Sequence, residues 1–263
     1  MMIFDTHAHY DASQFDQDRD EVLQKMNTAG VGWIVNATSD VASWQKTLEL
    51  VKNYSYLYGT MGVHPDCVGE LDEDRFTQLK QLARAEKIVA IGEIGLDYHW
   101  NIVAHEEQQK WFIRQIELAR ELQLPVVVHS REAGADTLSI MKEHAQGLAG
   151  VLHCFSSSAE IAREYVKMGF YIGIGGVVTF KNGRKLKEVV AKVPLASLVL
   201  ETDCPYLAPM PYRGKRNISS YLVYVAEEIG RIKAVSTEEV ITQTAENGCR
   251  LFGLQIGDKG GRD

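Results

Sequence analysis

The chain has few cysteines, and none of them belongs to a closely spaced pair. Its 263 residues contain four, Cys67, Cys154, Cys204 and Cys249, and no Cys-x-x-Cys spacing occurs. Disulfide frameworks are typical of short secreted chains, so free thiols in a reducing compartment fit this pattern better. We therefore expect a cytoplasmic protein whose cysteines mainly fill buried space.

Long hydrophobic runs and an excess of positive charge are also missing. No stretch approaches the roughly 18 apolar residues of a membrane span, so we expect no membrane association. The first residues show no basic segment followed by a long apolar stretch, so no signal peptide is expected. The formal net charge of −7 excludes a protein that coats nucleic acid with its whole surface, but it leaves room for a locally basic groove.

Short apolar runs alternate with amphipathic stretches along the whole chain. The predicted strands are Met2–Phe4, Gly32–Ala37, Leu57–Val63, Ile88–Ile94, Pro125–Val128, Gly150–Leu152, Phe170–Ile174 and Leu198–Leu200. The predicted helices are Asp16–Ala29, Val41–Asn53, Glu73–Ala85, His105–Leu122, Ala133–His144, Ser158–Met168, Arg184–Val193 and Tyr221–Gly230. A ninth helix, Thr237–Phe252, is expected to cap the resulting domain or to dock on its side.

Eight strands alternating with eight helices over about 250 residues predict an α/β protein with a (β/α)8 TIM barrel. The alternative is a doubly wound open sheet, which usually has a glycine-rich turn after its first strand. Here His7-Ala8-His9 follows that strand instead. No linker divides the chain, so we expect one domain over residues 1–263, with 254–263 as a frayed tail.

Polar side chains that bind metals follow many of the predicted strands. Five of the eight histidines lie just past an apolar run, and acidic residues lie at the end of the fourth strand and after the eighth. These residues are His7, His9, His64, His129, His153, Glu93, Glu201 and Asp203. One such histidine is more often a structural residue than a ligand. A barrel brings all of its strand ends to one mouth, however, and groups buried there need partners or a metal.

Four imidazoles and two carboxylates at one mouth favour a metal centre. The candidate ligands are His7, His9, Glu93, His129, His153 and Asp203. Mixed nitrogen and oxygen ligands suit zinc, manganese, cobalt, nickel or iron better than calcium. Six ligands exceed one tetrahedral site, so we expect two divalent metal ions bridged by Glu93. Two ions would activate a water for a displacement, with Asp203 as general base.

Seven segments resemble the TatD family of metal-dependent deoxyribonucleases, within the amidohydrolase superfamily. They are Asp5-Thr6-His7-Ala8-His9, Gly62-Val63-His64-Pro65, Gly92-Glu93-Ile94-Gly95-Leu96-Asp97-Tyr98, Val128-His129-Ser130-Arg131, His153-Cys154-Phe155-Ser156, the run 201–209 and Arg213-Gly214-Lys215-Arg216-Asn217. The resemblance covers residues 3 to about 217 and implies that the six candidate ligands hold divalent metals. It also implies release of nucleotides from DNA 3′ ends, commonly assayed with magnesium.

The chain differs from the family pattern in the metal that its ligands favour and at two places in its motifs. A histidine-rich shell prefers zinc, manganese or nickel, so we expect one of these in the isolated protein, with magnesium able to support activity. The family usually continues Arg-Gly-Lys-Arg-Asn with Glu-Pro, whereas Ile218 and Ser219 follow here, and Ser157 stands where glycine is common. The first difference puts the usual substrate contacts of that loop in question.

A phosphodiester substrate needs cations near the metals, and local basic groups supply them. The expected substrate-binding residues are His64, Arg131, Glu201, Tyr206, Arg213 and Lys215. Together with the metal centre they predict a hydrolase acting on single-stranded or frayed DNA ends. Hydrolysis of an amide, lactone or ester by the same metals stays open, as does a non-catalytic binding barrel whose metal is structural.

Overall fold

The computed structural model describes residues 2–255, and it contains one eight-stranded sheet. The strands are β1 Ile3–Ala8, β2 Val31–Asn36, β3 Leu57–Met61, β4 Ile88–Asp97, β5 Val126–Arg131, β6 Gly150–Leu152, β7 Tyr171–Ile174 and β8 Leu198–Leu200. Each strand pairs in parallel with the next one along the chain. The predicted (β/α)8 barrel is confirmed. The predicted tail falls mainly on residues 256–263, outside the described part of the chain.

The sheet closes through the residues that follow β8. The backbone N–H of Asp203 donates to the carbonyl of His7 at 3.0 Å, and that of His9 donates to the carbonyl of Cys204 at 2.8 Å. Ala8 and Cys204 form an isolated parallel bridge. The closure therefore aligns the histidine pair of β1 with Asp203.

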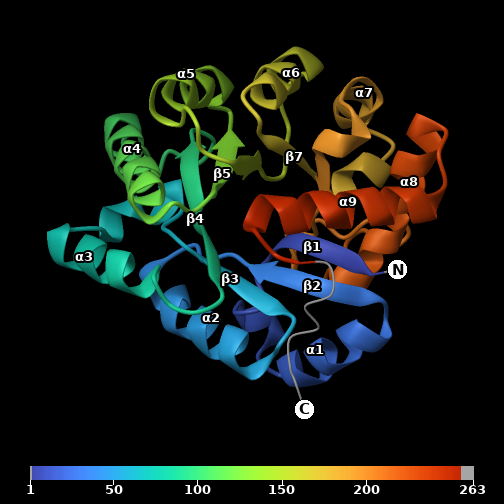
Figure 1. Ribbon diagram of the computed structural model, residues 1–263, viewed down its shortest axis with the longest axis horizontal. Helices are drawn as coiled ribbons and strands as arrows, with labels where there is room; N and C mark the ends of the chain where they lie inside the picture. The colour runs from blue at the N-terminus through green and yellow to red at the C-terminus, as the bar shows by residue number, and fades with distance from the viewer. Residues whose placement is uncertain (1, 256–263) are drawn as a thin grey trace.

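Helices surround the strands (Figure 1). They are α1 Arg19–Thr28, α2 Val41–Asn53, α3 Glu73–Leu82, α4 His105–Leu122, α5 Gly134–His144, α6 Ala159–Lys167, α7 Arg184–Lys192, α8 Leu222–Lys233 and α9 Thr237–Phe252. None of the helices within residues 2–255 is both long and apolar enough to cross a membrane. Strands such as β5, with Val126 to Val128 fully buried, are apolar on both faces because they lie between the barrel interior and this outer layer.

The ninth helix caps the barrel rather than docking on its side. Phe252 of α9 lies 5.8 Å from the ring of Phe4 on β1. Both belong to a buried cluster with inward side chains of β2, β3, β4, β5, β6 and β8. Figure 1 shows α9 across the ring of strands. The interior is thus sealed at this end, and the site lies at the other end, where the strands reach their carboxyl termini.

Strands β1, β4 and β5 extend beyond their predicted ends. The sequence predicted that β4 would stop at Ile94, but Gly95, Leu96 and Asp97 pair with residues 129–131 of β5. An added Cβ at Gly95, whose φ is +145°, would lie 1.9 Å from the carbonyl oxygen of His129. Glycine permits this close approach, and the extension carries Asp97 to the mouth.

Candidate metal centre

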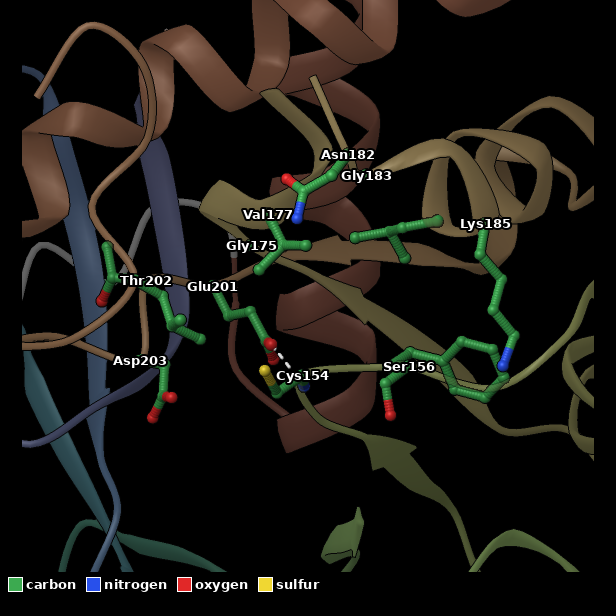
Figure 2. Close-up of a pocket in the computed structure, with 13 residues that line it drawn as sticks. Cys154, Ser156, Gly175, Val177, Asn182, Gly183, Lys185, Glu201, Thr202 and Asp203 are labelled. Carbon is green, nitrogen blue, oxygen red and sulfur yellow. Dashed lines mark hydrogen bonds between the residues drawn. The ribbon is translucent and has the colours of Figure 1, made fainter. Parts of the chain in front are cut away.

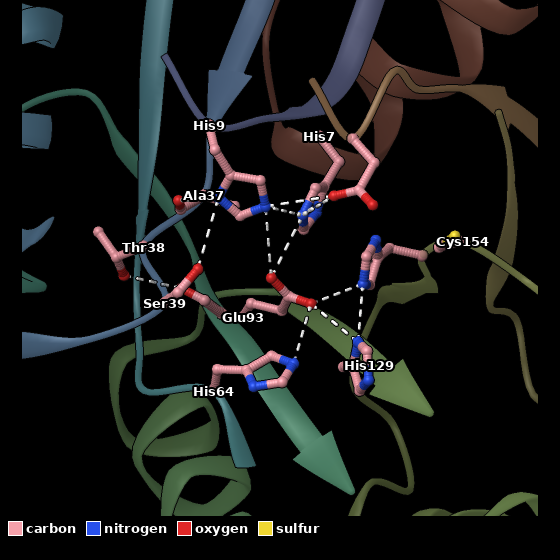
Figure 3. A network of polar contacts seen from close by, with 12 residues as sticks. His7, His9, Ala37, Thr38, Ser39, His64, Glu93, His129 and Cys154 are labelled. Carbon is pink, nitrogen blue, oxygen red and sulfur yellow. Dashed lines mark hydrogen bonds and ion pairs between the residues drawn. The ribbon is translucent and has the colours of Figure 1, made fainter. Parts of the chain in front are cut away.

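Glu93 lies at the centre of the mouth, and one of its oxygens faces the histidine pair of β1. Its Oε2 is 3.4 Å from His7 Nε2 and 3.6 Å from His9 Nε2, and the two nitrogens are 3.1 Å apart. Asp203 Oδ1 completes this group, 3.3 Å from His9 Nε2 and 3.8 Å from His7 Nε2. Four potential ligand atoms therefore converge on one side of the carboxylate (Figure 3).

The second oxygen of Glu93 faces a different pair of histidines. Its Oε1 is 2.6 Å from His153 Nε2 and 3.0 Å from His129 Nδ1, and these nitrogens are 3.2 Å apart. His64 Nε2 lies farther out, 3.8 Å from the same oxygen, and its ring packs edge-on against His129. The carboxylate thus joins two clusters of nitrogen ligands.

The spacing and chemistry of these atoms fit divalent metal ions. Zn–N bonds of 2.0–2.1 Å place the ligands of one tetrahedral ion about 3.3 Å apart, and the distances around each oxygen of Glu93 are similar. The described residues form three-member groups of potential ligands around both oxygens, including His7, His9 and Glu93 on one side and His64, Glu93 and His129 on the other. His64 is therefore a candidate ligand as well as the predicted substrate contact.

Hydrogen bonds fix which nitrogen of two histidines faces Glu93. The Nδ1 atom of His9 donates to the carbonyl oxygen of Ala37 at 2.9 Å, which directs Nε2 towards Glu93. The Nε2 atom of His129 is 3.0 Å from Asp97 Oδ2, which directs Nδ1 inward. Such outer partners orient metal-binding imidazoles and make them more basic.

Two glutamines of α4 hold the loops that carry polar groups to the mouth. The side chain of Gln108 accepts the N–H of Asp97 and donates to its carbonyl, both at 2.9 Å. Gln115 likewise accepts the N–H of Val63 at 2.8 Å and donates to its carbonyl at 3.2 Å, and Val63 is the residue before His64. Both glutamines are fully buried, so these bonds fix the backbone at Asp97 and His64.

Asp5 connects the β1 histidines to the loop after β8. It is fully buried and accepts hydrogen bonds from the N–H groups of His7 and Thr202 and from the hydroxyls of Thr202 and Ser219. Ser219 stands where the family pattern usually has proline. Its hydroxyl donates to Asp5, a hydrogen bond that proline could not make. The carboxylate therefore helps to fix the backbone beside Asp203.

The cluster shifts the pKa values of its own members. Burial would raise the pKa of Glu93, but the positive charges of His153 and His7 hold it well below its usual value. Burial would lower the pKa of His9, but its contacts with Asp203 and Glu93 raise it to about 10. In the metal-free protein, protons on imidazoles therefore balance the carboxylates.

These raised pKa values predict that metal binding releases protons. Burial opposes the shift of His129 as well, but Asp97 and Glu93 raise its pKa to about 9. At pH 7, His9 and His129 are protonated in the metal-free protein, and a metal must displace these protons. We expect metal affinity to rise between pH 6 and about 9 and at least one proton to be released per chain. Calorimetry in buffers of different ionisation enthalpy measures this release, and buffer-independent heats would contradict it.

Glu201 and the outer predicted residues do not lie together. Glu201 is fully buried, accepts the N–H of Cys154, and has Oε1 4.0 Å from His153 Nδ1. Burial raises its pKa to about 8, with the negative charge of Asp203 adding to the shift and His153 opposing it. From this position Glu201 can orient the His153 ring, and contact with a substrate stays a prediction.

The predicted basic and aromatic contacts are spread over the rim. Arg131 stacks over Trp100 at 5.3 Å, and Tyr206 is 52% exposed. Arg213 packs over Phe180 at 4.4 Å, and Lys215 is exposed in the loop after β8. These residues do not converge on Glu93 as the candidate ligands do, so substrate binding by them stays a prediction.

Sequence reasoning left Asp97 out of the site, although the structure places it against His129. The available signal was its spacing, because Asp97 lies four residues after Glu93 and even spacings in a strand share one face. The premature end predicted for β4 hid this relation. Asp66 was also missed, and it forms a further group of potential ligands with His64 and Asp97.

We expect Asp97→Asn to weaken metal binding beside His129 by about 10–100-fold, as is typical when an outer partner of a metal-binding histidine is lost. The other cluster should keep its affinity, because Asp97 does not contact His7 or His9. Competitive titration with a chelator would then show one weakened ion per chain. Exposed Asp74 on α3 offers the control Asp74→Asn, and equal weakening in both variants would contradict the assignment.

Comparison with known proteins identifies the family. The sequence model for TatD related DNases matches residues 4–253. The chain is 45% identical over 252 residues to a protein named uncharacterized metal-dependent hydrolase YabD from Bacillus subtilis (strain 168), covering 95% of this chain and 99% of that protein. It is 35% identical over 260 residues to the 3′-5′ ssDNA/RNA exonuclease TatD of Erwinia tasmaniensis, covering 96% of this chain and all of that protein.

A solved structure agrees with the sequence matches. The crystal structure of YjjV, a TatD homologue from Escherichia coli K12, superposes with a TM-score of 0.91 at 33% identity, covering 96% of this chain and 98% of that one. The match therefore extends over almost the whole of both chains. The chain belongs to the TatD family of metal-dependent hydrolases.

Proposed function

We propose that the protein hydrolyses phosphodiester bonds at DNA 3′ ends, using two divalent ions bridged by Glu93. The observation that carries this proposal is the division of the Glu93 carboxylate between two imidazole pairs, His7 with His9 and His129 with His153. One ion needs only one such cluster, whereas a bridged pair uses both. The histidine-rich surroundings favour zinc, manganese or nickel in the isolated protein.

The residues of the chain have distinct roles in this proposal. Two ions held here would lower the pKa of a water and offset negative charge on the phosphate. Asp203 is the general base: burial opposes its ionisation, but the hydrogen bond with His9 holds its pKa below the usual value. It is thus ionised at neutral pH and positioned to accept a proton at Oδ1. Neutral His64 is placed to donate a hydrogen bond to a phosphate oxygen from Nε2.

The rim supports a polyanionic substrate. Arg131 ends β5, and Lys46 lines a groove with His9 and Tyr206; neither cation is ion-paired with a described residue. Tyr206 and Trp100 are 52% and 59% exposed, and exposed aromatic rings stack on unpaired bases. The relative from Erwinia tasmaniensis, named an exonuclease acting on single-stranded DNA and RNA, supports the same substrate class.

A metal-dependent nuclease assay tests the proposal. A 5′-labelled single strand should be shortened from its 3′ end, EDTA should stop the reaction, and zinc, manganese, nickel or magnesium should restore it. p-Nitrophenyl phosphodiesters, lactones and N-acyl amides assayed in parallel separate phosphodiester hydrolysis from the other reactions open to this metal centre. If the protein hydrolysed lactones or amides but left DNA uncleaved, the proposal would be contradicted.

A further inference from the structure

A cavity adjoins the candidate metal clusters at Asp203. It has a volume of about 160 Å³ and lies between the loops that follow β6, β7 and β8. Asp203 and Glu201 line its inner side, and Figure 2 shows Asn182, Val177 and Lys185 around it. Because Asp203 also lies 3.3 Å from His9 Nε2, a group in the cavity would be adjacent to the reacting phosphate.

The walls of this cavity suit a flat apolar ring. Phe155, Val177, Leu186 and Leu207 line it, and Phe155 and Leu186 are buried. An engineered apolar cavity of about 150 Å³ accommodates one benzene ring. A pyrimidine is also a single six-membered ring, whereas a purine is larger by a second fused ring.

Polar groups at the inner side and rim match the edges of a base. Glu201 lines the inner side of the cavity, and its Oε1 atom accepts the N–H of Cys154 there, whereas its Oε2 atom is buried near Gly173. The amide of Asn182 lies at the rim with both a donor and an acceptor (Figure 2). Both pyrimidines carry an N–H donor and a carbonyl acceptor, which complement these groups.

One lysine of α7 is available to a nucleotide at this rim. Lys187 pairs with Glu228 at 2.8 Å and Lys192 pairs with Glu188 at 2.5 Å, whereas Lys185 lines the cavity and is not ion-paired with any residue described. Lys187 and Lys192 are therefore neutralised by carboxylates, whereas Lys185 beside the cavity is not.

We propose that this cavity binds the base of the 3′-terminal nucleotide and prefers a pyrimidine there. The inference rests on the proposed function and extends it to substrate selection. The terminal base enters between Val177 and Leu186 while its phosphate lies at Asp203, so the cavity places one nucleotide beyond the scissile bond. Lys185 contacts the released nucleotide.

The test compares oligonucleotides that differ only at the 3′-terminal position. Ends bearing dT, dC, dA, dG or an abasic sugar are cleaved under single-turnover conditions with the metal-loaded protein. We expect kcat/KM to be at least about tenfold higher for dT and dC than for dA and dG, a ratio within the range that pocket size produces. The abasic end should be cleaved more slowly than dT.

Two variants connect any preference to this cavity. Val177→Phe fills it, and the ratio of dT to abasic cleavage should fall towards one, while cleavage of the abasic end shows that the variant is folded. Lys185→Ala should raise KM for dT ends several-fold. Its matched control is Lys181→Ala, because Lys181 is exposed on the same segment but does not line the cavity.

The outcomes separate the pocket from the activity. Equal cleavage of all five ends, or a preference that survives Val177→Phe, overturns the assignment of the cavity and leaves phosphodiester hydrolysis intact. A preference for purines also overturns it. If the metal-loaded protein cleaves none of the five ends, the proposed function and the assignment of the cavity are both overturned.

Discussion

Asp203→Asn is expected to reduce turnover by about 10²–10⁴-fold, the range lost when a general base is removed. Asparagine keeps the size of the side chain and one oxygen beside His9 and His7, but it cannot accept the proton of an attacking water. The remaining imidazoles and Glu93 still surround both metal positions. Metal content should therefore stay near that of the unmodified protein although turnover is lost.

Single-turnover cleavage of DNA, together with elemental analysis of the same sample, measures both quantities. Asp74→Asn on α3 is the matched control, because it removes the same charge from an exposed residue away from the mouth. Turnover of Asp203→Asn within tenfold of the unmodified protein would exclude Asp203 as the base. Loss of metal in parallel with turnover would show that Asp203 is needed to hold the ions and would remove the support for its role as the base.

Glu93→Gln should abolish activity by removing both ions. Its Oε2 faces His7 and His9, and its Oε1 faces His129 and His153. Replacing the carboxylate by an amide removes the negative charge that two cations would share in the proposed centre and would leave an NH₂ group pointing at one of them. Loss of an outer partner alone weakens metal binding by about 10–100-fold, so loss of the bridge should exceed that at both positions.

Titration with a chromophoric chelator gives the affinities of the two ions separately. Glu86→Gln, at an exposed position before β4, controls for the change of charge. Thermal unfolding of the metal-free proteins checks that Glu93→Gln folds. If the variant kept one ion with unchanged affinity, Glu93 would belong to a single site and the bridged arrangement would be wrong.

The convergence of the six candidate ligands was predictable because it depends on topology. Each residue lies in the carboxyl half of a strand or just past its end, and a barrel of parallel strands brings all carboxyl ends to one mouth. His7 and His9 share a face through their spacing of two residues, and the structure places their Nε2 atoms 3.1 Å apart. No knowledge of side-chain packing was needed for this step.

The rim could not be predicted because it depends on contacts between distant segments. Arg216 looks equivalent to Arg213 and Lys215 in the sequence, yet it pairs with both carboxylate oxygens of Asp18, 198 residues away. That contact removes one of the cations that the loop after β8 was expected to offer to a phosphate. The cavity lined by Val177 similarly combines segments that follow three different strands.

Anomalous diffraction from metal-loaded crystals tests the central claim most directly. Data collected at the absorption edge of zinc, manganese or nickel should show two peaks per chain, one between Glu93 Oε2 and the His7–His9 pair and one between Glu93 Oε1 and the His129–His153 pair. A single peak, or two peaks that do not share Glu93, would contradict the bridged two-ion centre.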